Sequence, residues 1–138
     1  MRRNSWILLG LVAVLLVPVC IFRSTGRSGE VFTTSETLTA MINQRVSSLN
    51  VQITPLEVLE DSRCPVDVQC VWAGTVRLRA QFVDATGETE QVCTLDTPIM
   101  IEAHEVELVK VWPEPQAGKA IAPSEYRFEF RVTKVLPK

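Results

Sequence analysis

The side chains of this chain that can do chemistry gather around a pair of cysteines, Cys64 and Cys70. A disulfide between them would close a short loop and stabilise the fold by about 2.4 kcal/mol on a chain-entropy estimate. The alternative is a zinc site that Cys93 and His104 would complete, although zinc-binding cysteines usually stand closer together in sequence. A redox-active pair would normally have only two residues between the cysteines. We therefore predict a disulfide, with no bound metal and no cofactor.

The two other candidate ligands have simpler interpretations. Cys93 lies in a segment with a strand pattern, and we expect a small buried thiol, with pairing to Cys64 or Cys70 as the alternative. His104 is the only histidine, and because glutamates surround it we expect a solvated surface side chain. The sequence shows no nucleophile and base at the spacing of a known catalytic motif, so we predict a protein without enzymatic activity.

Charged residues beside the cysteines define a candidate recognition loop that contains Asp61, Arg63 and Asp67. Asp61 can close its own turn with an Asx hydrogen bond. Arg63 can form a two-pronged ion pair with Glu60 or Asp67. A loop that is already ordered loses less entropy on binding, so the same residues suit recognition, as in a protease inhibitor. We expect Trp72, which follows the second cysteine, to pack in the core.

The first residues of the chain predict a membrane-targeting segment. A basic N-terminus at residues 1–5 precedes an uncharged apolar run at residues 6–22, and a polar tether follows at residues 23–29. As a helix the run would be about 25 Å long, close to the roughly 30 Å of a bilayer core. We expect a single-pass anchor that holds the domain outside the cytoplasm, where a disulfide can form. The alternatives are a cleaved signal peptide and a lipoprotein acylated at Cys20.

The charge balance bears on the choice of partner. The chain has 14 basic and 16 acidic residues, and leaving out Arg2 and Arg3 gives a net charge of −4 for the rest. This mildly acidic part has no basic stripe, so nucleic acid is not expected as a partner. The expected partners are the membrane, through the N-terminal helix, and a protein of the cell envelope.

Residues 30–138 alternate between apolar and polar side chains in several segments, as half-buried strands do. Pro55 marks an edge, a bulge or a bend in one of them, and residues 36–49 fit either a helix or a strand. About seven short strands separated by turns predict an all-β fold, an antiparallel β-sandwich or small barrel. The two clearest segments would turn the following side chains inward: Val76, Leu78, Ala80, Phe82, Tyr126, Phe128, Phe130 and Val132.

One pattern resembles that of a known family. Residues 61–74 read Asp-Ser-Arg-Cys-Pro and, five residues later, Cys-Val-Trp-Ala-Gly. This resembles a family of small exported or membrane-anchored bacterial proteins of unknown function, and the resemblance extends over about residues 41–132. It implies a β-rich domain of the cell envelope, and it supplies no activity.

These patterns together predict a membrane-anchored β domain outside the cytoplasm that serves as a non-enzymatic binding or structural module of the envelope. The alternative is a secreted or periplasmic inhibitor-type protein that uses the loop between Cys64 and Cys70. The first function requires a surface that captures a partner, and the second requires a loop that enters a protease.

Overall fold

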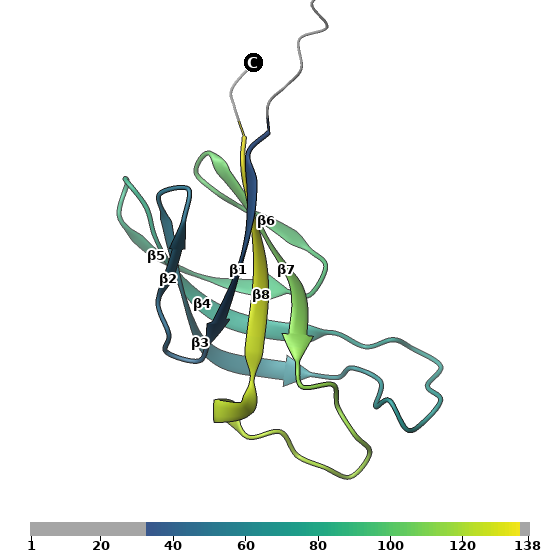
Figure 1. The fold of residues 1–138 in the computed structure, drawn as a ribbon. Helices are drawn as coiled ribbons and strands as arrows, with labels where there is room; N and C mark the ends of the chain where they lie inside the picture. Colours follow the sequence, from purple (N-terminus) through teal and green to yellow (C-terminus); the bar gives the residue numbers. More distant parts are fainter. Residues whose placement is uncertain (1–32, 136–138) are drawn as a thin grey trace, which may run out of the picture. The chain divides into compact units, whose positions relative to one another are not determined.

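The computed structural model describes residues 33–135, so the predicted basic N-terminus, apolar segment and tether lie outside the described residues. The described residues belong to a single compact unit. The described part is all-β, with two four-stranded antiparallel sheets and one short 3-10 helix, as Figure 1 shows. Within residues 33–135 no helix is long and apolar enough to cross a membrane.

Each sheet combines strands from different parts of the sequence. In spatial order, one sheet contains β1 (Ser35–Met41), β8 (Arg127–Lys134), β7 (His104–Trp112) and β6 (Pro98–Ile101). The other contains β2 (Val46–Ser48), β3 (Val51–Asp61), β4 (Val76–Val83) and β5 (Glu88–Thr94). The 3-10 helix η1 (Pro123–Glu125) leads into β8. Strands at the two ends of the domain, β1 and β8, therefore pair directly.

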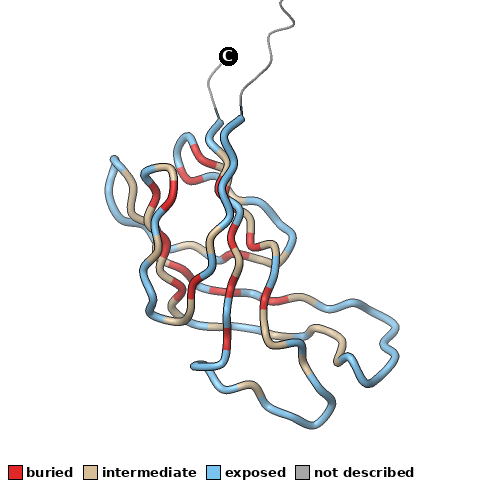
Figure 2. The backbone as a smooth tube through the Cα atoms, viewed as in Figure 1, coloured by how far each residue is buried: buried red, intermediate tan, exposed pale blue. Residues whose placement is uncertain are grey.

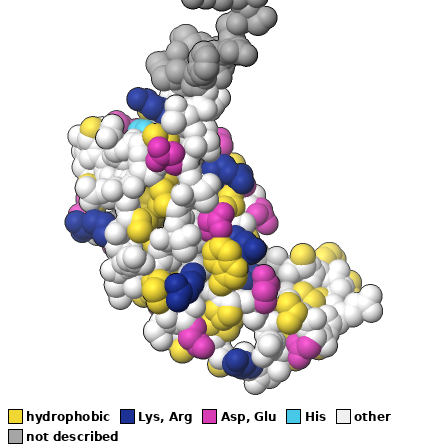
Figure 3. Space-filling view, viewed as in Figure 1, with side chains coloured by type: hydrophobic (Ala, Val, Ile, Leu, Met, Phe, Trp, Pro, Cys, Tyr) yellow, Lys and Arg dark blue, Asp and Glu magenta, His cyan; other side chains and the backbone are white. Residues whose placement is uncertain are grey.

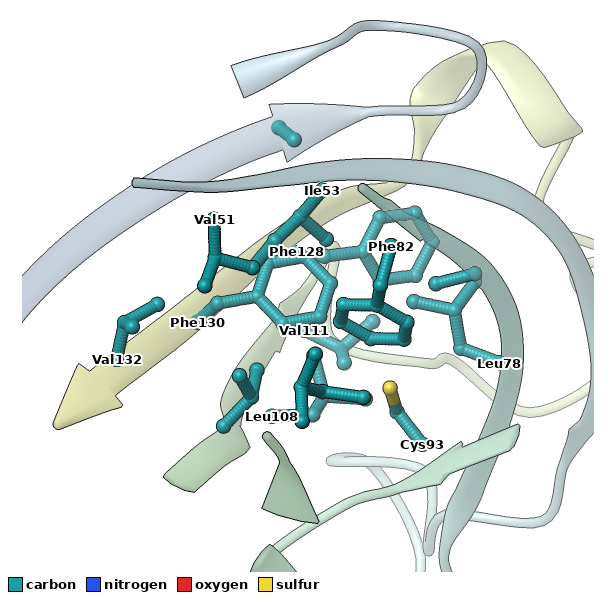
Figure 4. Close-up of a cluster of buried hydrophobic side chains, with 14 of the residues drawn as sticks. Val51, Ile53, Leu78, Phe82, Cys93, Leu108, Val111, Phe128, Phe130 and Val132 are labelled. Carbon is teal, nitrogen blue, oxygen red and sulfur yellow. The ribbon is translucent and has the colours of Figure 1, made fainter. Parts of the chain in front are cut away.

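The apolar faces of the two sheets share one core, in the manner of a β-sandwich. Figure 2 shows that the buried positions follow the strands while the connecting loops are exposed. Figure 4 shows side chains from both sheets, among them Phe82 from β4 and Phe128 from β8, meeting in this core. The predicted alternation is confirmed in both segments, since every side chain expected to face inward is buried.

The structure shows which elements residues 36–49 and Pro55 belong to. Residues 36–49 contain β1 and β2 and no helix. The pairing of β3 with β4 shifts register directly after Pro55, so of the predicted edge, bulge or bend the structure shows a bulge. A bulge tolerates proline because the ladder is already interrupted there.

His104 was expected at the surface, and the structure shows that this expectation was wrong. The side chain is only 9% exposed. It opens β7 on the same face as Val106 and Leu108, so the alternation of the strand carries it inward. Within the described residues neither ring nitrogen has a hydrogen-bond partner.

Candidate functional site

Two long loops extend from the same end of the sandwich, as Figure 1 shows. The first, which we call the tip loop, is residues 62–75 and joins β3 to β4. The second, the neighbouring loop, is residues 113–122 and joins β7 to η1. In the tip loop Cys64 and Cys70 form a disulfide with their Cα atoms 5.8 Å apart. The bridge closes the outer part of the tip loop.

The base of the tip loop is held by a two-pronged ion pair between neighbours in sequence. Arg63 donates from Nε to Asp61 Oδ1 at 2.9 Å and from Nη2 to Asp61 Oδ2 at 2.7 Å. Its backbone N–H also donates to Asp61 Oδ1 at 3.3 Å, which is the predicted Asx turn. Arg63 therefore pairs with Asp61, and not with Glu60 or Asp67 as we expected.

The same guanidinium reaches the end of β7. Its Nη1 donates to the carbonyl of Val111 at 2.6 Å, and its Nη2 donates to the carbonyl of Pro113 at 3.0 Å. The Arg63 side chain is 9% exposed and that of Asp61 is 12% exposed, so the pair is almost closed off from water. Arg63 thus fastens the tip loop to the start of the neighbouring loop.

Tyr126 also contacts the ion pair of Asp61 and Arg63. Its hydroxyl donates to Asp61 Oδ2 at 3.0 Å. Burial raises the pKa of Asp61, but the hydrogen bonds and charge of Arg63, with the Tyr126 hydroxyl, outweigh it and hold that pKa below its usual value. Burial, with the bond to Asp61, raises the pKa of Tyr126 to about 12. The carboxylate is therefore charged, and the phenol neutral, across the ordinary pH range.

A second set of contacts joins the two loops further out. Asp67 Oδ1 accepts a hydrogen bond from the backbone N–H of Ala117 at 2.8 Å. The backbone N–H of Val66 donates to the carbonyl of Pro115 at 3.0 Å. The two loops consequently support each other at their bases and along their lengths.

The return arm of the tip loop depends on a glycine. Gly74 has φ +69°, and a Cβ at this position would lie only 1.7 Å from the carbonyl oxygen of Ser62. Only glycine permits this approach of one arm to the other, which accounts for the glycine at the end of the Val-Trp-Ala-Gly run. Cys64 N–H donates to the Ala73 carbonyl at 3.0 Å beside it.

Above this platform the tip loop exposes apolar side chains. Val66 is 62% exposed, Val68 46%, Val71 89% and Trp72 82%. Figure 3 shows hydrophobic side chains gathered on the protrusion at this end of the molecule. Our expectation that Trp72 packs in the core is wrong, because β4 begins only at Val76 and Trp72 lies in the exposed loop before it.

The other candidate ligands lie apart from this loop. Cys93, in β5, is 1% exposed, as expected for a small buried thiol, and burial raises its pKa to about 12. Within residues 33–135 no three His, Cys, Asp or Glu side chains are grouped so that they could hold a metal ion. Since Cys64 and Cys70 are joined, the alternative in which Cys93 pairs with one of them does not apply.

Sequence reasoning overlooked two parts of the site. Tyr126 was expected as a core residue, and the alternation gave no sign that its hydroxyl would reach Asp61. Trp72 was overlooked as a surface residue because its type favours burial. A signal was present, since Trp72 follows a cysteine-closed turn and precedes the glycine, where a regular buried strand is not expected.

No protein-family model matches the chain, and neither a curated protein nor a solved structure matches it significantly. The resemblance carried by residues 61–74 therefore remains a prediction from the motif.

Proposed function

We propose that this protein is a non-enzymatic binding module of the cell envelope, held at a membrane by residues 6–22, that contacts its target through the tip loop. The observation that carries this proposal is the exposure of two successive large apolar side chains, Val71 and Trp72, at 89% and 82%. They stand on a loop that a disulfide closes and that a second loop supports.

Exposed apolar side chains that gather in one place mark interaction sites, whereas single ones are normal. Contact between these apolar side chains and water is unfavourable. Burying Trp72 against a target would contribute about 1.5–3 kcal/mol to the free energy of binding. The contacts beneath the loop order it before it meets a target, so less conformational entropy is lost on binding. Both effects favour a contact surface at the tip.

In this proposal the charged residues of the predicted recognition loop hold the loop in position and do not contact the target. Asp61, Arg63 and Asp67 all direct their side chains to partners inside the molecule. They position the loop, and the apolar residues at its outer end make the contact. A test of recognition must therefore change Trp72 and not Arg63, because a change at Arg63 would disturb the loop itself.

The second candidate function is inhibition of an envelope protease. It is favoured by the position of Val71 and Trp72 directly after Cys70, where a disulfide holds an accessible stretch of backbone. An inhibitor would slow a protease at stoichiometric concentration, and the Trp72→Ala variant would lose this effect. A module of the first kind would leave every envelope protease unaffected.

The experiment that tests the proposal is site-specific photo-cross-linking in the full chain within its native envelope. The cross-linking residue replaces Val71, and the matched control places it at Val92, which is 38% exposed on the edge strand β5. We expect a discrete adduct, with a protein or a lipid, from position 71 and none from position 92. An equal yield from both positions, or no adduct from position 71, would contradict the proposal.

A further inference from the structure

We propose that the target of the tip loop is the interfacial region of a lipid bilayer, which Val71 and Trp72 enter. This inference rests on the proposed function and names the class of target. It is carried by the composition of the loop surface, by the engagement of its charges and by the pairing of its backbone.

The apolar side chains at the tip are concentrated as nowhere else in residues 33–135. Four of the eight exposed large hydrophobic residues there lie between positions 66 and 72. The other four lie outside this stretch: Leu59, Val92, Met100 and Val135. Three of the four at the tip are valines, a residue type that is under-represented among the anchors of protein interfaces. Tryptophan is enriched both among such anchors and where proteins meet the bilayer surface, so the valines distinguish the two kinds of target and Trp72 fits either.

The tip loop also offers no free charged side chain for a protein partner to pair with. Arg63 and Asp67 are the only charged residues of the tip loop, and each is bound to atoms within the molecule. A protein interface usually contains a hydrogen bond for every 100–200 Å² or so of contact. A bilayer interface requires only apolar side chains, and the indole N–H of Trp72 can pair with water or a headgroup.

The backbone of the loop limits how deeply it can enter. The N–H groups of Cys64 and Val68 are paired with the carbonyls of Ala73 and Pro65, whereas within residues 33–135 those of Val71 and Trp72 have no hydrogen-bond partner. Because unpaired backbone groups are excluded from hydrocarbon, the side chains enter while the loop itself stays at headgroup level. Since the tip has no free cation, binding should not depend on anionic lipid.

The position of the tip in the domain leaves it accessible to a surface. Figure 1 shows that the start of β1 and the end of β8 lie at the end of the sandwich away from the two loops. Because residues 6–22 precede β1, the tip lies at the opposite end of the sandwich from the strand that follows the proposed anchor, and the bilayer that it enters need not be the one that holds the anchor.

The test uses the fluorescence of Trp72 in the full chain. Trp6→Phe and Trp112→Phe leave Trp72 as the only tryptophan. The protein is mixed with phosphatidylcholine vesicles and with vesicles of the same lipid brominated in its acyl chains. The matched control also carries Trp72→Ala and Val92→Trp, which moves the indole to β5.

We expect the emission of Trp72 to shift to shorter wavelength with vesicles and to be quenched by the brominated lipid, with or without added anionic phospholipid. The control should show neither effect. Equal quenching in both proteins, quenching that requires anionic lipid, or none at position 72 would overturn the inference. If quenching is absent while a cross-linker at position 71 yields a protein adduct, the target is a protein and the proposed function stands. If both are absent, the proposed function fails as well.

Discussion

Arg63 holds the carboxylate of Asp61, two residues before it, through two charge-assisted hydrogen bonds of 2.9 and 2.7 Å. The same guanidinium donates to the carbonyls of Val111 and Pro113, about fifty residues further along the chain. A local pair thereby joins the end of one sheet to the end of the other. The exposed apolar surface of the tip loop is built on this junction.

Removing Arg63 should destabilise the protein strongly. Arg63→Ala leaves an almost buried carboxylate without its ionic partner, and we expect a loss of about 3 kcal/mol or more in the free energy of unfolding. Arg63→Lys keeps the charge but not the planar geometry, so it should recover only part of this loss. Denaturant unfolding measures both changes.

The matched control for Arg63 is Arg79→Ala. Arg79 pairs with Glu57 at 2.7 Å, but the two side chains are 46% and 56% exposed. Exposed pairs contribute less than about 1 kcal/mol. Similar losses at both arginines would show that the junction described above does not hold the loop.

The charge of Asp61 should make stability depend on pH in the acid range. The folded-state pKa of Asp61 is lowered, so between that value and its ordinary value the unfolded chain binds more protons than the folded one. The contribution of Asp61 is therefore full above about pH 4 and is lost as the pH falls below it.

The variant Asp61→Asn isolates this contribution from that of the other acidic groups. It should be less stable than the native protein at pH 7, and the difference between the two should shrink as the pH falls below about 4. Thermal unfolding over a pH series measures it. A difference that stays constant down to acid pH would show that the charge of Asp61 contributes nothing.

Loss of the disulfide should destabilise the protein moderately. Cys64→Ser opens a seven-residue ring, and we expect the free energy of unfolding to fall by about 2 kcal/mol. A reductant should lower the stability of the native protein by a similar amount and leave that of Cys64→Ser unchanged. Insensitivity of the native protein to reductant would show that the bridge is not present in solution.

His104 should be replaceable by an apolar residue. Both of its ring nitrogens are buried without a partner among the described residues, and such groups lower stability by about 1–3 kcal/mol. We expect His104→Leu to unfold at the same temperature as the native protein or at a higher one. A fall in stability of more than about 2 kcal/mol would mean that the imidazole makes a stabilising contact.

Much of the fold was predictable because alternation depends only on neighbouring residues. The alternation correctly placed Phe82 and Phe128 in the core. It also indicated that His104 would be buried, because His104 lies two residues before Val106 and so on the same face of the strand. The glutamates beside His104 outweighed that signal in our interpretation, although they lie on the opposite face of the strand or in the preceding turn.

The site was less predictable because it depends on contacts distant in sequence. Nothing near Arg63 indicates that the carbonyls of Val111 and Pro113 will lie beside it, since that follows from how the sheet that contains β3 packs on the sheet that contains β7. The exposure of Trp72 likewise depends on where β3 and β4 end. Residue type alone favours burial of tryptophan, and here the topology decides otherwise.

The central claim is that Trp72 makes contact while the residues beneath it maintain the loop. The most direct test is the yield of the adduct from a cross-linker at position 71 in the native chain and in Trp72→Ala, with thermal unfolding of both. We predict that Trp72→Ala melts at the native temperature and loses the adduct. Retention of the adduct, or a large fall in melting temperature, would contradict the claim.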